Sequence, residues 1–242
     1  PLIPVHHIRG HIAANYIAYP DLQPPFLCLV VSGGHTMIVH VKDYTEMEIL
    51  GGTLDDAAGE SFDKVARVLG MPYPGGAALD KMAQNGDETK YDLPRSKPGE
   101  NPYNMSFSGL KTAALNLIHH AEQVGEELDI PSLCAAFTAA VSDTLVPRVE
   151  RAIRETGCKQ VAVAGGVAAN SRIRADFEKA AKKALEIMTT EYGNPSSLHT
   201  LGFRASKELE SARGQVADAV GAKDDPTQNA IHTHVIANIG GE

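Results

Sequence analysis

The chain of 242 residues lacks several features that would place it in a particular class of protein. It contains no run of 18 or more apolar residues, so we expect no membrane-spanning helix. Its first seven residues have neither a basic start nor an apolar core, so we expect no signal peptide. Its cysteines, Cys28, Cys134 and Cys158, are odd in number and show no CxxC spacing. Buried free thiols in a reducing cytoplasm are therefore expected.

Basic segments are also scarce. The formal net charge is −8, and no stretch is rich in lysine and arginine. A protein that binds nucleic acid neutralises phosphates with cations, so much of that counter-charge would have to come from a partner or from a local patch. The rest of the composition, 43% hydrophobic and 21% charged, is typical of a globular protein with a substantial core.

A pair of glycines between two apolar runs is the clearest local pattern. The run 26–29 leads into Val30–Thr36, and a second apolar run follows at 37–41, which predicts strand, turn and strand. Gly33 and Gly34 leave main-chain N–H groups uncovered, so the backbone could close on a phosphate-like group. A simple reversal of the chain is the alternative interpretation.

Two histidines lie four residues apart on a helix predicted over Val5–Ala18. At this spacing His7 and His11 project from one face and could bind one metal ion, or the pair could be incidental. Ile8 stands where the helix motif of zinc peptidases has its glutamate base. A third ligand would have to come from elsewhere in the chain.

Hydrophobic periodicity and turn residues predict the remaining elements. In order, they are a short strand at 46–50, a helix from Asp55 or Asp56 to about Leu69, a helix opening at Gly75–Gly76, a surface loop over 84–103, a helix ending near Val124, a core helix from Pro131 to about Gly157, and a buried strand at 160–164. An aspartate at 55 or 56 is expected to cap the helix that follows it.

Four polar or small residues are candidates for a ligand site. Asp63 is either a solvated acid or a hydrogen-bond acceptor at a site. Gly76 lies at a predicted helix start, where the backbone can approach a ligand closely, and Asp80 lies one turn further on the same side. A second glycine pair, Gly165–Gly166, ends a strand, and Asn170 after it could cap a helix or bind a ligand.

Taken together, six ordered motifs closely resemble the bacterial tRNA threonylcarbamoyladenosine transferase (TsaD) family, formerly called the glycoprotease family. They are His7–His11, Val30–Thr36, Asp55–Lys64, Tyr73–Gly76, Ser106–Thr112 and Gly165–Asn170. The resemblance covers residues 1 to about 184. It implies an α/β fold shared with actin, sugar kinases and heat-shock ATPases, with two lobes around a nucleotide cleft.

The resemblance also implies an activity and a site. The family transfers a threonylcarbamoyl group from threonylcarbamoyl-AMP to the exocyclic amine of the tRNA adenosine beside the anticodon. His7 and His11 look like two of three ligands of one iron or zinc ion. No catalytic side chain is assigned. The residues expected to contact the substrate are Val30, Val31, Ser32, Gly33 and Gly34 at the reactive end of the adenylate, and Asp63, Gly76, Asp80 and Asn170 at its nucleotide part, with ATP as a second candidate nucleotide.

Partners and location follow from the same resemblance. It implies tRNA, a TsaB-like protein and a TsaE-like ATPase as partners, with no membrane and a cytoplasmic location. Such partners fit the scarcity of basic segments in this chain.

Two pieces of the family pattern are not found in the chain. The segment with the first strands of one lobe would precede Pro1, and the Asp-Asn-Ala motif with the third metal ligand would follow the helix after Asn170. Since the chain opens on Pro1 without Met, we expect a piece of a longer polypeptide, incomplete at the N-terminus and altered at the C-terminus.

The tail has a different resemblance. Residues 185–222 are similar to the N-terminal segment of NifS/IscS-type cysteine desulfurases, without the pyridoxal-binding lysine of that family, and 223–242 are unassigned. His232 and His234 are interpreted as an exposed pair, with replacement metal ligands as the alternative. Two further hypotheses stay open for the whole chain: a non-catalytic nucleotide-binding remnant, and a metallopeptidase, which Ile8 disfavours.

Overall fold

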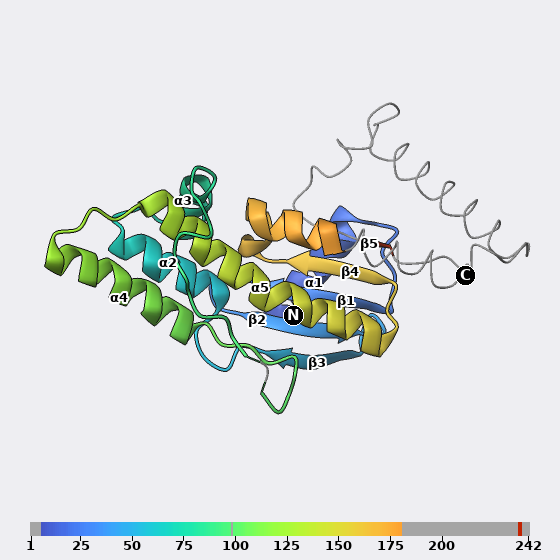
Figure 1. Ribbon diagram of the computed structural model, residues 1–242. Helices are drawn as coiled ribbons and strands as arrows, with labels where there is room; N and C mark the ends of the chain where they lie inside the picture. The colour runs from blue at the N-terminus through green and yellow to red at the C-terminus, as the bar shows by residue number, and fades with distance from the viewer. Residues whose placement is uncertain (1–5, 98, 181–236, 239–242) are drawn as a thin grey trace, which may run out of the picture.

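The computed structural model describes residues 6–97, 99–180 and 237–238, which form a mixed sheet covered by helices on both faces (Figure 1). The α/β class predicted from the sequence is therefore confirmed. The strands are β1 Phe26–Val31, β2 Thr36–Val41, β3 Met47–Gly52, β4 Gln160–Ala164 and β5 Ala237–Asn238. The helices are α1 His7–Ala18, α2 Ala58–Val68, α3 Gly75–Ala83, α4 Ser108–Val124 and α5 Ile130–Thr156, followed by the short 3₁₀ helix η1 Gly166–Ala169 and a helix described over 171–180.

The strand order is β3-β2-β1-β4-β5. Strands β1, β2 and β3 form an antiparallel meander, whereas β1 and β4 run parallel, with Val30 opposite Ala164. A parallel pair needs a long crossover, and here α2, α3, α4 and α5 all lie between the two strands in the chain. The carboxyl ends of β1 and β4 therefore meet at one edge of the sheet.

Alternation along β1 divides the core into two layers, because successive side chains of a strand point to opposite faces. Leu27, Leu29 and Val31 belong to the larger cluster, with side chains from α2, α4 and α5. Cys28 and Val30 belong to the smaller cluster, which α1 covers. The site at the end of β1 is thus supported by packed helices on both sides.

Helix α5 is the central helix of the larger layer and crosses the sheet in Figure 1. Among the described residues it is the one helix long and apolar enough to cross a membrane, and 72% of its apolar window is buried within the fold. Because most of its apolar surface is covered by the rest of the fold, α5 is interpreted as a core helix.

Most of the elements predicted from periodicity are confirmed, with ends shifted by a few residues. The predicted loop over 84–103 contains no helix or strand among its described residues. The three cysteines are free and buried, as expected, and burial raises the pKa of Cys28 and of Cys134 to about 12. The desulfurase-like segment 185–222 and the pair His232 and His234 lie outside the described residues.

Candidate functional site

The two glycine-containing turns predicted from the sequence meet at the shared edge of β1 and β4. Gly165 directly follows β4 and has a φ of +106°, a backbone conformation that residues other than glycine rarely adopt. A Cβ atom at Gly165 would overlap the carbonyl oxygen of Val31 and lie 3.2 Å from the Cβ of Ser32. The turn after β1 and the turn after β4 are therefore in direct contact.

The turn between β1 and β2 closes on itself through Ser32 and His35. The Ser32 N–H donates to the His35 carbonyl at 2.8 Å, and the His35 N–H donates to Ser32 Oγ at 3.2 Å. Gly33 and Gly34, between them, are exposed, and no atom lies within 4 Å of a Cβ built on either. A ligand could therefore approach this stretch of backbone without meeting a side chain.

The N-terminus of α2 packs directly on this turn. The Ala58 N–H donates to Thr36 Oγ1 at 2.9 Å, and the Gly59 N–H donates to the Ser32 carbonyl at 3.2 Å. A Cβ atom at Gly59 would lie 2.5 Å from that carbonyl oxygen, so the close packing requires glycine there. The helix thus aims its first N–H groups at the Ser32–His35 turn.

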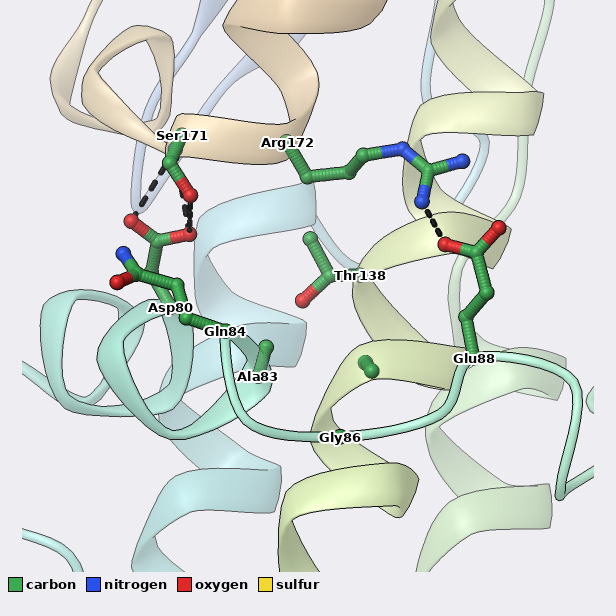
Figure 2. A pocket seen from close by; sticks show the side chains of 9 residues that line it. Asp80, Ala83, Gln84, Gly86, Glu88, Thr138, Ser171 and Arg172 are labelled. Atoms are coloured by element: carbon green, nitrogen blue, oxygen red, sulfur yellow. Dashed lines mark hydrogen bonds and ion pairs between the residues drawn. The ribbon is translucent and has the colours of Figure 1, made fainter.

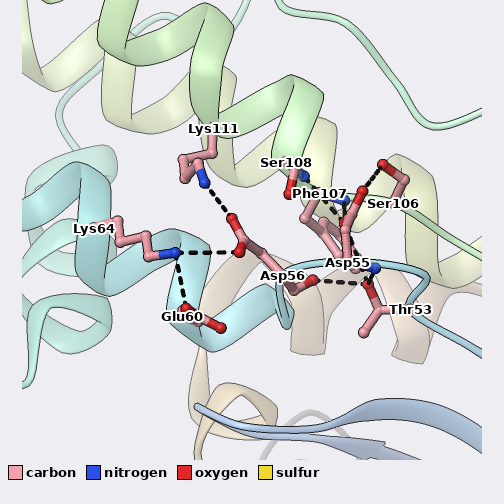
Figure 3. A network of polar contacts seen from close by, with 9 residues as sticks. All are labelled: Thr53, Asp55, Asp56, Glu60, Lys64, Ser106, Phe107, Ser108 and Lys111. Carbon is pink, nitrogen blue, oxygen red and sulfur yellow. Dashed lines mark hydrogen bonds and ion pairs between the residues drawn. The ribbon is translucent and has the colours of Figure 1, made fainter.

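The prediction that Asp55 or Asp56 caps α2 was wrong. Residue Ala57 occupies the N-cap of α2 and makes no side-chain cap. Asp55 instead caps α4, because its carboxylate accepts from the N–H groups of Phe107 and Ser108 at 2.8 and 3.2 Å (Figure 3). Ser106 Oγ also donates to Asp55, at 2.5 Å. Burial would raise the pKa of Asp55, but these three hydrogen bonds outweigh it and lower that pKa.

Asp56, which follows Asp55 before the start of α2, forms ion pairs with lysines of two helices. Its carboxylate lies 2.5 Å from Lys111 Nζ of α4 and 3.1 Å from Lys64 Nζ of α2, and Lys64 also pairs with Glu60 (Figure 3). The hydrogen bond from Lys111 is the main cause of the lowered pKa of Asp56. The contacts of Asp55 with Phe107 and of Asp56 with Lys111 hold the start of α2 against α4. Each joins residues more than 50 positions apart, so local sequence patterns could not reveal them.

Asp63 is a residue of α2, and its side chain reaches the first residues of α3. Its Oδ1 atom accepts from the N–H groups of Gly75 and Gly76 at 2.8 and 3.3 Å, which caps α3. A Cβ atom at Gly75 would lie 2.5 Å from the Cβ of Ala66, so the two helices are in close contact. The structure therefore brings the candidate residues Asp63 and Gly76 together, with the carboxylate accepting the backbone bonds.

Asp80 and Asn170 meet at the start of the helix over 171–180. The Asp80 carboxylate accepts from the Ser171 N–H at 3.1 and 3.2 Å and from Ser171 Oγ at 2.7 Å (Figure 2). Asn170 is 6% exposed, and its Oδ1 atom accepts from the Ile173 N–H at 3.0 Å. The capping role proposed for Asn170 is confirmed, and its position next to the Asp80 partner keeps the ligand interpretation open.

A cavity of about 240 Å³ opens beside Asp80. Its walls come from α3, the following loop, α5 and the helix over 171–180, and an ion pair between Arg172 and Glu88 lies at the side away from Asp80 (Figure 2). Arg172 also donates to Asp176 at 2.7 Å. The Asp80 carboxylate beside this cavity can accept hydrogen bonds from a polar ligand, whereas the Arg172 guanidinium group is already paired with Glu88 and Asp176.

The histidines of α1 lie beside the Ser32–His35 turn. The Nε2 atoms of His7 and His11 are 3.1 Å apart, and the ring of His35 lies near that of His7, with centroids 5.5 Å apart. Burial, and then the nearby His7 and His35, lower the pKa of His11, which favours the neutral imidazole that a metal ion needs. In the side-chain conformations present, no group of three or more His, Cys, Asp or Glu residues in the described part of the chain could hold a metal ion.

The candidate residues thus form a continuous row of neighbours. It runs from the histidines through the Ser32–His35 turn to Gly165, and from α2 through Asp63 and Gly76 to α3, which carries Asp80 beside Ser171 and Asn170.

A family model described as TsaD, tRNA N6-adenosine threonylcarbamoyltransferase, matches residues 1–195. The chain belongs to the TsaD family. Every candidate residue of the site lies within the matched range, and the match extends about ten residues beyond the resemblance seen in the motifs. The similarity of 185–222 to cysteine desulfurases remains a prediction.

Curated relatives in the TsaD family are similar over most of this chain. The protein of Caldicellulosiruptor bescii is 50% identical over 193 residues, which is 79% of this chain and 57% of the relative. The protein of Clostridium botulinum is 49% identical over 189 residues, or 78% of this chain and 56% of the relative, and that of Moorella thermoacetica is 50% identical over 184 residues, or 76% and 54%. All three are named tRNA N6-adenosine threonylcarbamoyltransferase. The chain spans about half the length of the curated relatives it matches.

Proposed function

We propose that this chain carries the site of a transferase that moves a threonylcarbamoyl group from threonylcarbamoyl-AMP to the exocyclic amine of the tRNA adenosine beside the anticodon. The observation that carries the proposal is the family match over 1–195, which includes the whole row of neighbouring site residues. The names of the three relatives support the same reaction for this chain.

The adenylate binds along the edge where β1 and β4 end. Asp63, Gly76, Asp80 and Asn170 hold its nucleotide part, and the cavity beside Asp80 provides room for polar groups. The carboxylate of Asp80 accepts hydrogen bonds from Ser171, and its oxygen atoms have further lone pairs that can accept from hydroxyl groups of a ligand. Threonylcarbamoyl-AMP is the proposed nucleotide, with ATP as the second candidate.

The reactive end of the adenylate lies at the Ser32–His35 turn. Val30 and Val31, which the resemblance also places there, are fully buried in the core and support the turn from below. The exposed backbone at Gly33 and Gly34 can donate hydrogen bonds to oxygen atoms on which negative charge develops. The start of α2 packs on the same turn, and its N-terminal dipole favours negative charge there.

The pair His7 and His11 would hold one iron or zinc ion. For a zinc–nitrogen bond of about 2.0–2.1 Å, two ligands of a tetrahedral ion are about 3.4 Å apart, so the 3.1 Å between the Nε2 atoms fits a pair of ligands. When bound, the ion supplies a Lewis acid for the carbamoyl carbonyl. The neutral state of His11, favoured by burial, keeps its nitrogen available.

The described α/β unit is proposed to be one lobe of an actin-like fold, within a domain over residues 1–184 that is followed by the segments 185–222 and 223–242. Transfer to tRNA is proposed to take place in the cytoplasm with TsaB-like and TsaE-like partners. A metallopeptidase is disfavoured, because Ile8 follows His7 where a glutamate base is required. The alternative, a non-catalytic nucleotide-binding remnant, would bind the same adenylate but would not transfer the threonylcarbamoyl group to tRNA.

Binding of the adenylate tests the site directly. We expect isothermal titration of the full chain with threonylcarbamoyl-AMP to show one site, and Asp80→Asn to weaken it about tenfold or more, because the amide keeps the size of the carboxylate but loses its charge and one acceptor. His119→Ala, on the exposed face of α4, is the matched control and should bind normally. Equal affinity of the wild type and Asp80→Asn, with both proteins folded by circular dichroism, would argue against this placement of the nucleotide.

A further inference from the structure

Thr36 is a buried polar residue of the β1–β2 hairpin to which the proposed function gives no role. It is the first residue of β2, pairs with Val31 across the hairpin and is 1% exposed. Its hydroxyl oxygen, Oγ1, accepts a hydrogen bond at 2.9 Å from the N–H of Ala58, the first residue of α2. The N-cap residue of α2, Ala57, makes no side-chain cap, so Thr36 supplies that cap from another element of the fold.

Both ends of the turn between β1 and β2 are bonded to consecutive N–H groups of α2. The Ser32 carbonyl accepts from the Gly59 N–H at 3.2 Å on one side, and Thr36 Oγ1 accepts from the Ala58 N–H on the other. Between these two anchors the Gly33–Gly34 backbone is exposed, and no described atom lies within 4 Å of a Cβ built on either glycine. The direction of the two glycine N–H groups therefore depends on how the ends of the turn are held.

The backbone of Thr36 makes a second connection to the start of α2. Its carbonyl accepts from the Thr53 N–H at 2.8 Å, and Thr53 Oγ1 donates to the Asp56 carbonyl at 2.7 Å, two residues before α2. A substitution of the Thr36 side chain keeps the first of these bonds, because that bond uses the main chain. Removing only the hydroxyl should therefore leave the hairpin and α2 in place while releasing the first N–H of α2 from the turn.

We propose that Thr36 is a positioning residue for the transfer reaction. Its hydroxyl holds the turn against α2, so that the Gly33 and Gly34 N–H groups point at the oxygen atom on which negative charge develops. Donors fixed in advance stabilise such charge without rearranging during the reaction, and a loosened turn loses part of this stabilisation. Because Thr36 is buried, water has little access to replace its hydroxyl as the acceptor for Ala58. This inference rests on the proposed function and adds a residue to it.

The nucleotide part of the site is held by other bonds. Asp63, in the middle of α2, caps α3, and Asp80 of α3 accepts from Ser171. Neither of these contacts uses the Thr36 hydroxyl. Loss of the hydroxyl is therefore expected to slow transfer while the affinity for the adenylate stays the same, which is the pattern of an interaction that acts mainly in the transition state.

Variants of the full chain separate the hydroxyl from the rest of the side chain. Thr36→Val keeps the shape of threonine without the hydroxyl, and Thr36→Ser keeps the hydroxyl without the methyl group. Thr45→Val, in the exposed turn between β2 and β3, is the control. For each protein, kcat and KM for threonylcarbamoyl-AMP are measured with unmodified tRNA and the TsaB-like and TsaE-like partners, and exchange of the Ala58 amide proton is followed by nuclear magnetic resonance. A melting curve verifies the fold, and if Thr36→Val does not fold, Thr36→Cys, whose sulfur is a weak acceptor, takes its place.

We expect the Ala58 amide proton of Thr36→Val to exchange about tenfold faster or more than that of the wild type, because it has lost its acceptor. We also expect kcat to fall about tenfold, with KM within about twofold of the wild type. This fall is smaller than the loss of about 100–1,000-fold that follows removal of an oxyanion donor, since here the donors are only displaced. Thr36→Ser should stay within about threefold of the wild type in both measurements, and Thr45→Val should match the wild type.

Three results would overturn the role of Thr36 and leave the proposed function standing. An unchanged kcat or an unchanged Ala58 exchange in Thr36→Val would mean that the turn keeps its shape without the hydroxyl. Equal losses in Thr36→Val and Thr36→Ser would mean that the packing of the side chain matters instead. A raised KM at unchanged kcat would mean that Thr36 acts on nucleotide binding. A folded wild type that binds the adenylate but transfers nothing would overturn the proposed function and this inference together.

Discussion

Replacing Gly165 by alanine is expected to lower the free energy of unfolding by about 3–5 kcal/mol. Two costs add: a residue with a side chain at a φ of +106° is strained, and its Cβ atom would overlap the Val31 carbonyl where the two turns meet. The turn can relieve this overlap only by separating the ends of β1 and β4. We therefore also expect weaker binding of the adenylate in this variant.

Equilibrium unfolding in urea at 25 °C measures the effect. The neighbouring Gly166→Ala is the matched control, because no atom lies within 4 Å of a Cβ at that position and its φ is not in the positive range. We expect Gly166→Ala to change the free energy of unfolding by less than about 1 kcal/mol. Equal losses in the two variants would mean that the two turns are not packed as described.

Replacing Arg148 by methionine is expected to cost about 3 kcal/mol of stability. Arg148 is 6% exposed, and its guanidinium group donates to the carbonyls of Asn104, Thr144 and Ser96 at 2.8, 2.7 and 3.0 Å. Burial lowers its pKa from the usual value. Methionine keeps the packing of the aliphatic stem but leaves the part-buried carbonyls of Asn104 and Ser96 without this donor, whereas the Thr144 carbonyl keeps its helical bond. Each hydrogen bond from a charged group contributes about 1.5–3 kcal/mol.

Arg148 also anchors the loop over 84–103 to α5, which supplies a second measurement. In Arg148→Met, trypsin should cleave more rapidly after Arg95 and Lys97, since both lie in that loop. Arg151→Ala, one turn further along α5, is the control, because its pairing with Glu155 is exposed and worth less than about 0.5 kcal/mol. If Arg148→Met were as stable as Arg151→Ala, the loop would be held by other contacts.

Local patterns predicted the elements of this fold well. The apolar runs around Gly33 and Gly34 indicated β1 and β2, and the run at 160–164 indicated β4. The long apolar stripe after Pro131 indicated α5. Each of these signals depends on residues within a few positions of one another, as periodicity does.

The partners of the polar residues could not be predicted in this way. Asp55 was expected to cap the helix that directly follows it, yet it caps α4, whose N-cap residue Phe107 lies 52 positions away. Asp80 binds Ser171 across 91 residues, and no spacing rule reaches that far. The caps that distant carboxylates form on helices are therefore the main feature of the site that only the tertiary structure reveals.

The central claim is that this row of residues transfers a threonylcarbamoyl group, and transfer itself is the most direct test. Labelled threonylcarbamoyl-AMP and unmodified tRNA are incubated with the full chain and the TsaB-like and TsaE-like partners, and label in tRNA is counted. We expect transfer by the wild type, and a rate at least about 100-fold lower in His7→Ala, because a Lewis acid lowers the barrier by several kcal/mol. No transfer from a folded wild-type chain that binds the adenylate would contradict the claim and favour a non-catalytic nucleotide-binding protein.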